Sequence, residues 1–340
     1  MQVSFGLDTF GDIQSDQNGN PISAAQTIRN VVAEAELADQ LGIDHFNVGE
    51  HHRDDFAVSA PDSVLAGIST KTNRITLGSG VTVLSSDDPV RVYQRFATVD
   101  ALSNGRAEIT AGRGSFIESF PLFGYDLSDY ALLFEEKLEL LVELLKERPV
   151  NWSGQTRAPL HNQNVFPKTE RGAIPLRVGV GGTPESVVRA ARLNAKLALA
   201  IIGGDPARFA PFSNLYRKSM EDFGNSQLPI SIHSPGFIAD SDEEAIERHW
   251  PNHEKMFGRI GRERGWAPIT KEHYLQEVKY GSLYVGSPET VAKKIVHAIK
   301  SVGAQRFDLK YANGPQTHQE LLQCIELYGT KVIPLVKEAL

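Results

Sequence analysis

The sequence predicts an α/β protein folded as a (β/α)₈ TIM barrel with insertions, in one domain spanning residues 1–340. Short apolar or β-branched segments alternate with longer amphipathic segments along the chain, which is the pattern of parallel βα units. About eight such units follow one another without a Pro/Ser-rich linker, which fits one barrel better than an open doubly wound sheet. Runs such as Leu197–Ile202 are apolar without alternation, as expected of parallel strands buried on both faces.

The first four units have clear boundaries. The helix expected after the first strand carries apolar residues at helical spacing, and Ser23 with Gln26 predicts a capping box at its start. Asp88 followed by Pro89 marks another helix start. The expected strands are Val3–Leu7, His45–Gly49, Ile75–Leu84 and Ala107–Ala111, and the helices that follow them are Ala24–Leu41, Asp62–Thr70, Pro89–Leu102 and Tyr130–Lys146.

The last four units carry helix-start signals of the same kind. A cap residue precedes proline at Thr183–Pro184, Asp205–Pro206 and Ser287–Pro288, and Ser241 to Glu244 predicts a further capping box. The expected strands are Leu176–Val180, Leu197–Ile202, Ile230–Ile238 and Arg306–Lys310; the helices are Pro184–Leu193, Pro206–Phe223, one starting at Ser241, and Thr317–Leu327.

Two segments are too long for ordinary barrel connections. They cover about residues 147–174, rich in Pro, Asn and Gln, and about residues 258–287. Insertions of this length act as lids or substrate walls, or are decorative loops; the sequence leaves both open.

Composition excludes several classes of protein. The formal charge of -7 argues against a nucleic-acid surface or an anionic membrane surface, so small molecules or other proteins are the expected partners. No apolar run approaches a membrane span, and the chain starts without a basic signal region. The single cysteine, Cys324, excludes an intrachain disulfide and is expected to be a buried, inert thiol. We therefore expect a cytoplasmic protein.

The most informative polar residues are Glu50, His51 and His52, which follow the second strand directly. Neighbouring residues of an extended chain point to opposite faces, so only one of the two imidazoles is expected to face the barrel mouth. The alternative is a pair of ordinary loop histidines bonded to backbone groups.

Two glycine-rich segments follow neighbouring strands. Gly181, Gly182 and Thr183 open a helix, which directs backbone N–H groups and a positive helix end toward an anion such as phosphate. Arg113, between two glycines, is placed to hold the same phosphate, with a tight turn as the alternative for each segment. A dinucleotide-binding fingerprint fails because Pro184 stands where its third glycine belongs.

The remaining candidates are weaker. His249 and His253 have the spacing of a metal pair on a helix, but Pro251 between them is expected to disturb that helix, so we expect solvated surface histidines and no metal site. His161 and His233 have no evident partners in the sequence. Lys310, at the end of the eighth strand, is the candidate base of a phosphate-ester aldolase or isomerase; we expect instead a structural partner for Asp308 or a neighbouring carboxylate.

An ordered set of motifs resembles the bacterial luciferase-like flavin-dependent monooxygenases over essentially the whole chain. The motifs are residues 47–52 (NVGEHH), 74–84 (RITLGSGVTVL) with 88–91 (DPVR), 102–106 (LSNGR) leading to 111–114 (AGRG), 178–186 (VGVGGTPES) and 285–289 (VGSPE).

The resemblance implies a barrel that binds FMN, or in some branches the deazaflavin F420, at the carboxyl ends of its strands. It implies a catalytic role for His51. It also implies that Arg113, with Gly114 and Ser115, binds the flavin phosphate, and that a phosphate-binding loop lies at Gly181, Gly182 and Thr183. Luciferase itself has an acidic residue and a serine in place of the two glycines, so phosphate contacts are expected from backbone N–H groups. The family also implies a non-proline cis peptide bond at Gly80–Val81, beneath the flavin ring.

The expected reaction is oxygenation of a small organic substrate by reduced FMN and O₂, the reduced flavin being supplied by a separate NAD(P)H:flavin reductase. His51 is expected to act as base or hydrogen-bonding group, with Glu50 orienting it. Family members are commonly dimers, so a homodimer is expected, with helix 62–70 and its neighbours at the interface. The alternatives are hydride transfer by F420 or a flavin without oxygen, and a non-catalytic flavin-binding protein.

Overall fold

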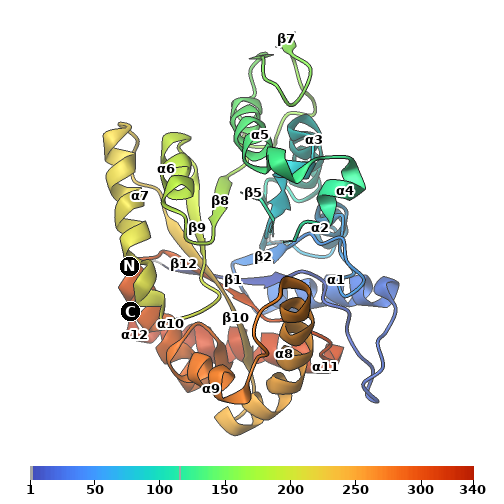
Figure 1. Cartoon of the computed structure of the whole chain (residues 1–340), viewed down its shortest axis with the longest axis vertical. Helices are drawn as coiled ribbons and strands as arrows, with labels where there is room; N and C mark the ends of the chain where they lie inside the picture. The colour runs from blue at the N-terminus through green and yellow to red at the C-terminus, as the bar shows by residue number, and fades with distance from the viewer. Residues whose placement is uncertain (1–2, 115) are drawn as a thin grey trace.

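Eight parallel strands form a closed ring in the computed structural model, which describes residues 3–114 and 116–340. In ring order each strand pairs with the next, and β9 pairs with β10 to close the barrel (Figure 1). The TIM barrel is thus confirmed. The ring consists of β10 (Ile230–Ile238), β12 (Arg306–Lys310), β1 (Ser4–Thr9), β2 (His45–Val48), β3 (Thr76–Ser79), β5 (Ala107–Gly112), β8 (Leu176–Val180) and β9 (Lys196–Ala200).

The strands agree with the predicted ones to within a few residues, apart from the third. The predicted strand Ile75–Leu84 is interrupted: β3 ends at Ser79, and β4 (Thr82–Val83) pairs separately with β5. The peptide bond between them, Gly80–Val81, is cis, as the family resemblance implied. The prediction of one continuous strand was therefore wrong at this bond.

Helices pack around the outside of the ring (Figure 1). The α-helices are α1 (Ala24–Gln40), α2 (Pro61–Ser69), α3 (Pro89–Leu102), α4 (Ser119–Phe123), α5 (Tyr130–Leu144), α6 (Pro184–Arg192), α7 (Ala210–Asp222), α8 (Asp242–Arg264), α9 (Lys271–Tyr280), α10 (Pro288–Val302), α11 (His318–Leu327) and α12 (Ile333–Ala339). Single turns of 3₁₀-helix lie at Leu84–Ser86, Leu127–Asp129 and Pro206–Phe209, and a π-helical turn at Tyr328–Val332. No helix of the described segments is long and apolar enough to cross a membrane.

Most predicted helix caps form. Asp88, Asp205 and Ser287 accept hydrogen bonds from backbone N–H groups of the helical turns that they open. Ser23 and Ser241 also cap their helices, but the predicted capping boxes are only half formed, because the side chains of Gln26 and Glu244 bond other side chains instead. Thr183 is the exception, since its side chain caps no backbone group of α6.

Both predicted insertions contain regular structure. In residues 147–174, β6 (Val150–Trp152) and β7 (Leu160–Gln163) form an antiparallel hairpin. In residues 258–287, the chain completes α8, forms α9, and adds β11 (Tyr284–Gly286) beside β10. The expectation that Pro251 disturbs its helix was wrong, because the 23-residue helix α8 runs through Pro251 without interruption.

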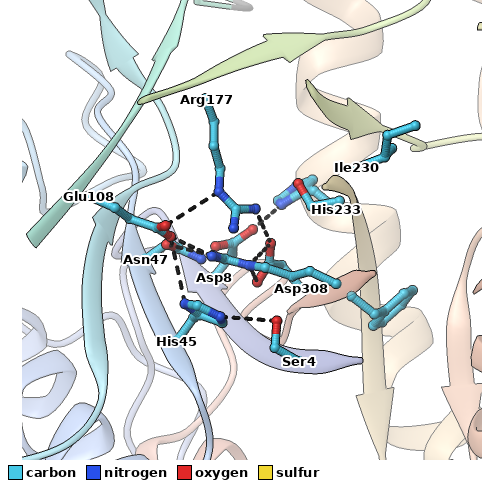
Figure 2. A network of polar contacts seen from close by, with 12 residues as sticks. Ser4, Asp8, His45, Asn47, Glu108, Arg177, Ile230, His233 and Asp308 are labelled. Carbon is cyan, nitrogen blue, oxygen red and sulfur yellow. Dashed lines mark hydrogen bonds and ion pairs between the residues drawn. The ribbon is translucent and has the colours of Figure 1, made fainter. Parts of the chain in front are cut away.

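The barrel has an apolar layer outside the strands and a polar interior. Residues that alternate toward the helices, such as Phe5, Leu7 and Phe46, are fully buried. Cys324 is also buried, as predicted, and burial raises the pKa of its thiol to about 12. Residues that alternate inward are charged or hydrogen bonding at the amino ends of the strands (Figure 2). This polar layer is the floor beneath the candidate site.

Candidate active site at the barrel mouth

The mouth of the barrel, at the carboxyl ends of the strands, has two contrasting halves. On four consecutive strands, β2, β3, β5 and β8, the residues that end the inward-facing rows are glycines. We call this set the glycine rim: Gly49, Gly80, Gly112, Gly179 and Gly181. On β1, β10 and β12 the inward-facing rows carry side chains near the mouth. We call this set the side-chain rim: Asp8, Phe10, His233 and Lys310.

The glycine rim makes room for Val81. A Cβ on Gly112 would lie 2.6 Å from the Val81 side chain, and one on Gly179 would lie 3.1 Å from it. The Val81 side chain therefore fits between two strands because neither has a side chain at that level. A Cβ on Gly181 would meet nothing within 4 Å, so the backbone above Val81 is open to a ligand.

Arg113 and the segment Gly181–Thr183 follow neighbouring strands. The pairing of Ala111 with Val178 places both segments at the same level of the barrel. Gly182 has a φ of +117°, and the Thr183 hydroxyl donates to Ser186 Oγ at 2.8 Å instead of capping α6. The first turn of α6 therefore presents backbone groups to an anion without competition from its cap residue. This arrangement suits a phosphate group.

Tyr130 orders the Arg113 side of this site. Its ring centroid lies 5.2 Å from the guanidinium carbon of Arg113, and its hydroxyl donates to the backbone oxygen of Gly114 at 3.2 Å. Gly114 has a φ of +78°, a conformation that favours glycine. Ser115, predicted beside it, lies outside the described residues.

His51 lies in an apolar cage. Its ring centroid is 4.5 Å from that of Phe56, 4.7 Å from Phe10 and 4.8 Å from Phe116. Only 9% of the residue is exposed, and its Nε2 atom has no hydrogen-bond partner among the described residues. Burial, with smaller repulsion from Lys310 and Arg53, lowers the pKa of His51 to about 3. The imidazole is therefore neutral at physiological pH.

Glu50 does not orient His51, which corrects the prediction. One of its carboxylate oxygens lies 2.9 Å from His52 Nε2, and the other accepts the backbone N–H of Val83 at 3.1 Å. Glu50 therefore positions His52 and ties β2 to β4. His52, but not His51, also lines a cavity of about 170 Å³ together with Asp62, Arg95 and Phe123.

A cluster of ion pairs closes the mouth beside His51. Arg53, in the segment after β2, pairs with Glu118 at 2.8 Å and with Glu263 of α8 at 2.7 Å. Arg259 of α8 pairs with Asp54 at 2.6 Å. We call this cluster the α8 latch. The cavity that touches His51 and Phe116 measures only about 10 Å³, whereas ligand pockets typically span roughly 300–1,000 Å³.

The α8 histidines are not on the surface, which corrects a second prediction. His249 is fully buried and His253 is 3% exposed, because this face of α8 packs on Tyr274 of α9 and Phe237 of β10. His249 Nδ1 lies 3.0 Å from the Tyr274 hydroxyl. Burial lowers the pKa of His253 to about 4. In residues 3–114 and 116–340 no group of three or more His, Cys, Asp and Glu is arranged to hold a metal ion.

Lys310 pairs with a neighbouring carboxylate, as predicted. Its Nζ lies 3.2 Å from Asp12 and also donates to the backbone oxygen of Ala312. The neighbouring carboxylate is thus Asp12, whereas Asp308 bonds Arg306 at 2.7 Å.

Comparison with known proteins identifies the family. The family model described as luciferase-like monooxygenase matches residues 5–306. The chain belongs to the luciferase-like monooxygenase family.

Three known proteins are similar to this luciferase-like chain. N-acetyl-S-alkylcysteine monooxygenase of Bacillus subtilis is 25% identical over 252 residues, covering 70% of each chain. The oxygenating constituent of 3,6-diketocamphane monooxygenase from Pseudomonas putida, solved in complex with FMN, has a TM-score of 0.79 at 18% identity, covering 98% of each chain. The coenzyme F420-dependent tetrahydromethanopterin reductase of Methanopyrus kandleri has a TM-score of 0.73 at 19% identity, covering 98% of this chain and 99% of that one. At these identities the two structures establish the shared fold.

Several residues at the mouth of this luciferase-like barrel were missed from the sequence. Asp8 lies one residue beyond the predicted end of the first strand, and Phe10 follows it. His233 interrupts an otherwise buried strand, and Arg53 pairs with a residue 210 positions away. Two signals in the sequence could have identified these residues. Asp8 alternates onto the same strand face as Gly6, and a histidine lies inside the predicted seventh strand. No signal in the sequence indicated the partner of Arg53.

Proposed function

We propose that this protein is a flavin-dependent monooxygenase that uses reduced FMN and O₂ to oxygenate a small organic substrate. The observation that carries the proposal is the glycine rim, which leaves Val81 as a platform beside an uncapped helix start and Arg113. Such a surface suits a planar ring with a phosphate tail. The FMN complex of the 3,6-diketocamphane enzyme and the likeness to N-acetyl-S-alkylcysteine monooxygenase support this choice.

Each predicted residue receives a role in this proposal. Arg113, with Gly114 and Ser115, and the backbone of Gly181–Thr183 would hold the flavin phosphate. Gly80 and Val81 would lie beneath the ring. Reduced FMN supplies the two electrons that activate O₂.

His51 acts in this proposal as a neutral hydrogen-bonding group. Its cage of three phenyl rings excludes water, which favours oxygenation over loss of the activated oxygen to solvent. Glu50 contributes indirectly, because its bonds to His52 and Val83 hold the ends of β2 and β4 in place.

The alternative is hydride transfer by F420 or a flavin without participation of O₂. Hydride transfer is the second candidate because the chain shares its fold with the F420-dependent reductase of Methanopyrus kandleri. The space beside the Gly181 backbone is compatible with the tail of FMN or of F420 in this proposal. A non-catalytic flavin-binding protein is a third candidate, which substrate-dependent turnover would exclude.

The test is a binding titration followed by turnover. FMN, reduced FMN and F420 are titrated first; reduced FMN is then supplied by an NAD(P)H:flavin reductase, with a panel of sulfides, ketones, terpenes and aldehydes, in air and under argon. We expect substrate-dependent oxygen uptake and an oxygenated product. Product formation at the same rate under argon would reject the monooxygenase in favour of hydride transfer.

A separate reductase is part of the proposal. The reaction should proceed equally well with reduced FMN from any of several unrelated flavin reductases or from chemical reduction. Turnover that requires one particular reductase would indicate a complex between the two proteins instead.

A further inference from the structure

Asp8 and His233 form an imidazole–carboxylate pair on the side-chain rim. His233, on β10, directs Nδ1 at a carboxylate oxygen of Asp8, on β1, across the intervening strand β12 (Figure 2). A carboxylate on one ring nitrogen fixes the tautomer, so that Nδ1 carries the proton toward Asp8 and Nε2 is left free to accept or, when the ring is charged, to donate.

The pair is accessible on the side of the mouth. His233 is the one residue of β10 that is not buried, and 18% of its side chain is exposed. No hydrogen bond from Nε2 to the described part of the chain is found. The second oxygen of Asp8, Oδ1, is buried without a partner and would lie 3.3 Å from a Cβ placed on Gly80. The unused oxygen of Asp8 therefore adjoins the glycine rim at Gly80.

Charged groups on several strands surround the Asp8–His233 pair. Asp8 faces it from β1, Asp308 lies beside it on β12, and Lys310 lies one inward position further along β12. Arg177 of β8 reaches Asp308 at 4.0 Å from the far side of the barrel. Burial raises the pKa of Asp308 to about 6; repulsion from Asp8 adds to this effect and Arg306 opposes it. The β9 residue paired with His233 is Ala200, which carries no charge.

His51 and His233 differ in what they can do. Phe10 lies between them, edge-on to His51 and stacked with His233 at 6.1 Å. His51 has no carboxylate and is held neutral in an apolar cage, whereas His233 has a carboxylate partner and an open nitrogen. His233 is therefore the better group for moving a proton.

We propose that the Asp8–His233 pair exchanges a proton with an oxygen atom of the substrate, and that the substrate carries a hydroxyl or carbonyl group there. The imidazolium gives its Nε2 proton to that oxygen, the N–H bond breaks as the O–H bond forms, and the neutral ring keeps its Nδ1 proton on Asp8; the reverse transfer restores the cation. The inference rests on the proposed function for the location of the substrate. It holds for hydride transfer between an alcohol and a carbonyl compound, in which the substrate oxygen gains or loses a proton, and for oxygenation of a substrate that carries such an oxygen.

The first experiment compares His233→Gln, Asp8→Asn and His233→Gly with a matched control, His297→Gln. His297 pairs with Asp205 at 3.1 Å, but both side chains are at least half exposed. With whichever reduced cofactor supports turnover, we expect kcat to fall about a hundredfold or more in His233→Gln and Asp8→Asn, as is typical for loss of general acid–base catalysis. KM and the dissociation constant for oxidised cofactor should change by less than about threefold, and His297→Gln should match the wild type. Added imidazole should restore turnover to His233→Gly.

Two results would overturn the proposal. Full kcat in a folded His233→Gln protein would show that the imidazole moves no proton. Loss of kcat in His233→Gly without rescue by imidazole, accompanied by weakened cofactor binding, would assign the pair to structure alone.

A readout independent of turnover uses histidine ¹⁵N NMR of the protein without cofactor. At alkaline pH, the His233 signal should report the Nδ1-protonated tautomer in the wild type, and Asp8→Asn should remove that bias. An unbiased tautomer in the wild type would contradict the pairing itself. Because this measurement needs no substrate, failure of the proposed monooxygenase reaction would leave it intact and is thus distinguished from failure of the inference.

Discussion

At the scale of single residues, surroundings decide the chemistry more than residue type does. His51 and His233 are both imidazoles at strand ends, yet one is enclosed by phenyl rings and the other is bonded to a carboxylate. The sequence singled out His51 because it follows a strand next to Glu50. It did not show that Glu50 turns toward His52, since that choice depends on where Val83 presents its N–H group.

The caged His51 should make stability depend on pH. Its pKa is about 3 in the folded protein and near 6.5 when unfolded, so below pH 6.5 the unfolded chain binds a proton that the folded protein excludes. The free energy of unfolding should therefore fall as pH drops from 6.5 toward 3. Relative to His51→Phe, the wild type should lose about 2–3 kcal/mol between pH 7 and pH 4. Urea unfolding at both pH values measures this difference.

The control for this experiment is His161→Phe, which replaces an exposed histidine. It should show the same pH dependence as the wild type. Parallel pH profiles of the wild type and His51→Phe would contradict a neutral, enclosed imidazole.

Arg113 should contribute affinity only through the phosphate. Loss of a charge-assisted hydrogen-bonded pair typically costs about 1.5–3 kcal/mol, so Arg113→Met should raise the Kd for FMN about 10- to 100-fold. Riboflavin, which lacks the phosphate, should bind both proteins equally. Fluorescence titration measures both ligands, and Arg91→Met, at an exposed arginine bonded to Gln94, is the matched control. An equal loss of affinity for FMN and riboflavin would show that Arg113 does not act through the phosphate.

At the scale of elements, α8 connects distant parts of the chain over the mouth. The start of α8 at Ser241 was predicted from the sequence, but its length was not. Pro251 was expected to disturb the helix, and residues 258–264 were assigned to an insertion. The helix tolerates the proline because its other face packs on α9 and β10, and tertiary packing outweighs one lost backbone bond. Such packing partners are far apart in sequence and leave no local signal.

The α8 latch should control local opening of the mouth. Glu263→Gln removes the carboxylate that Arg53 and Arg259 share, while Arg259 keeps Asp54. Hydrogen–deuterium exchange should become severalfold faster in residues 257–264 and also in residues 116–124, which lie against Arg53 through Phe116 and Glu118. Glu254→Gln, at an exposed site on the same helix, should change neither segment. Faster exchange confined to α8 would mean that the cluster stabilises the helix alone.

At the scale of the whole molecule, the fold could be predicted because its signals are repetitive. Eight apolar runs, each followed by an amphipathic segment with a marked start, specify a barrel almost regardless of local errors. The candidate site could be predicted only in part. Gly80, Val81, Arg113 and Gly181–Thr183 lie in local motifs, whereas the Asp8–His233 pair joins residues 225 positions apart and appears only when the ring closes.

The proposed homodimer can be tested without knowing the substrate. With α2 and its neighbours at the interface, sedimentation should give twice the 37.4 kDa mass of one chain. Gly67→Arg should shift the protein toward monomer. A Cβ at Gly67 has no neighbour closer than 4.0 Å, so the larger side chain fits the isolated chain. Asn214→Arg, on the exposed face of α7, should leave the mass unchanged. A single-chain mass for the wild type would reject the dimer.

The glycine rim and the side-chain rim place the proposed cofactor surface and the proposed substrate-contacting side chains on different strands. Four neighbouring strands offer backbone, which any ligand of the right shape meets identically, and the strands opposite offer replaceable side chains. Substitutions at Phe10 should therefore change which substrates react without weakening binding of the proposed cofactor, whereas Asp8 and His233 are needed for the proposed proton transfer. A scaffold built this way can change its chemistry one residue at a time, which makes the side-chain rim the natural place to redirect this enzyme by design.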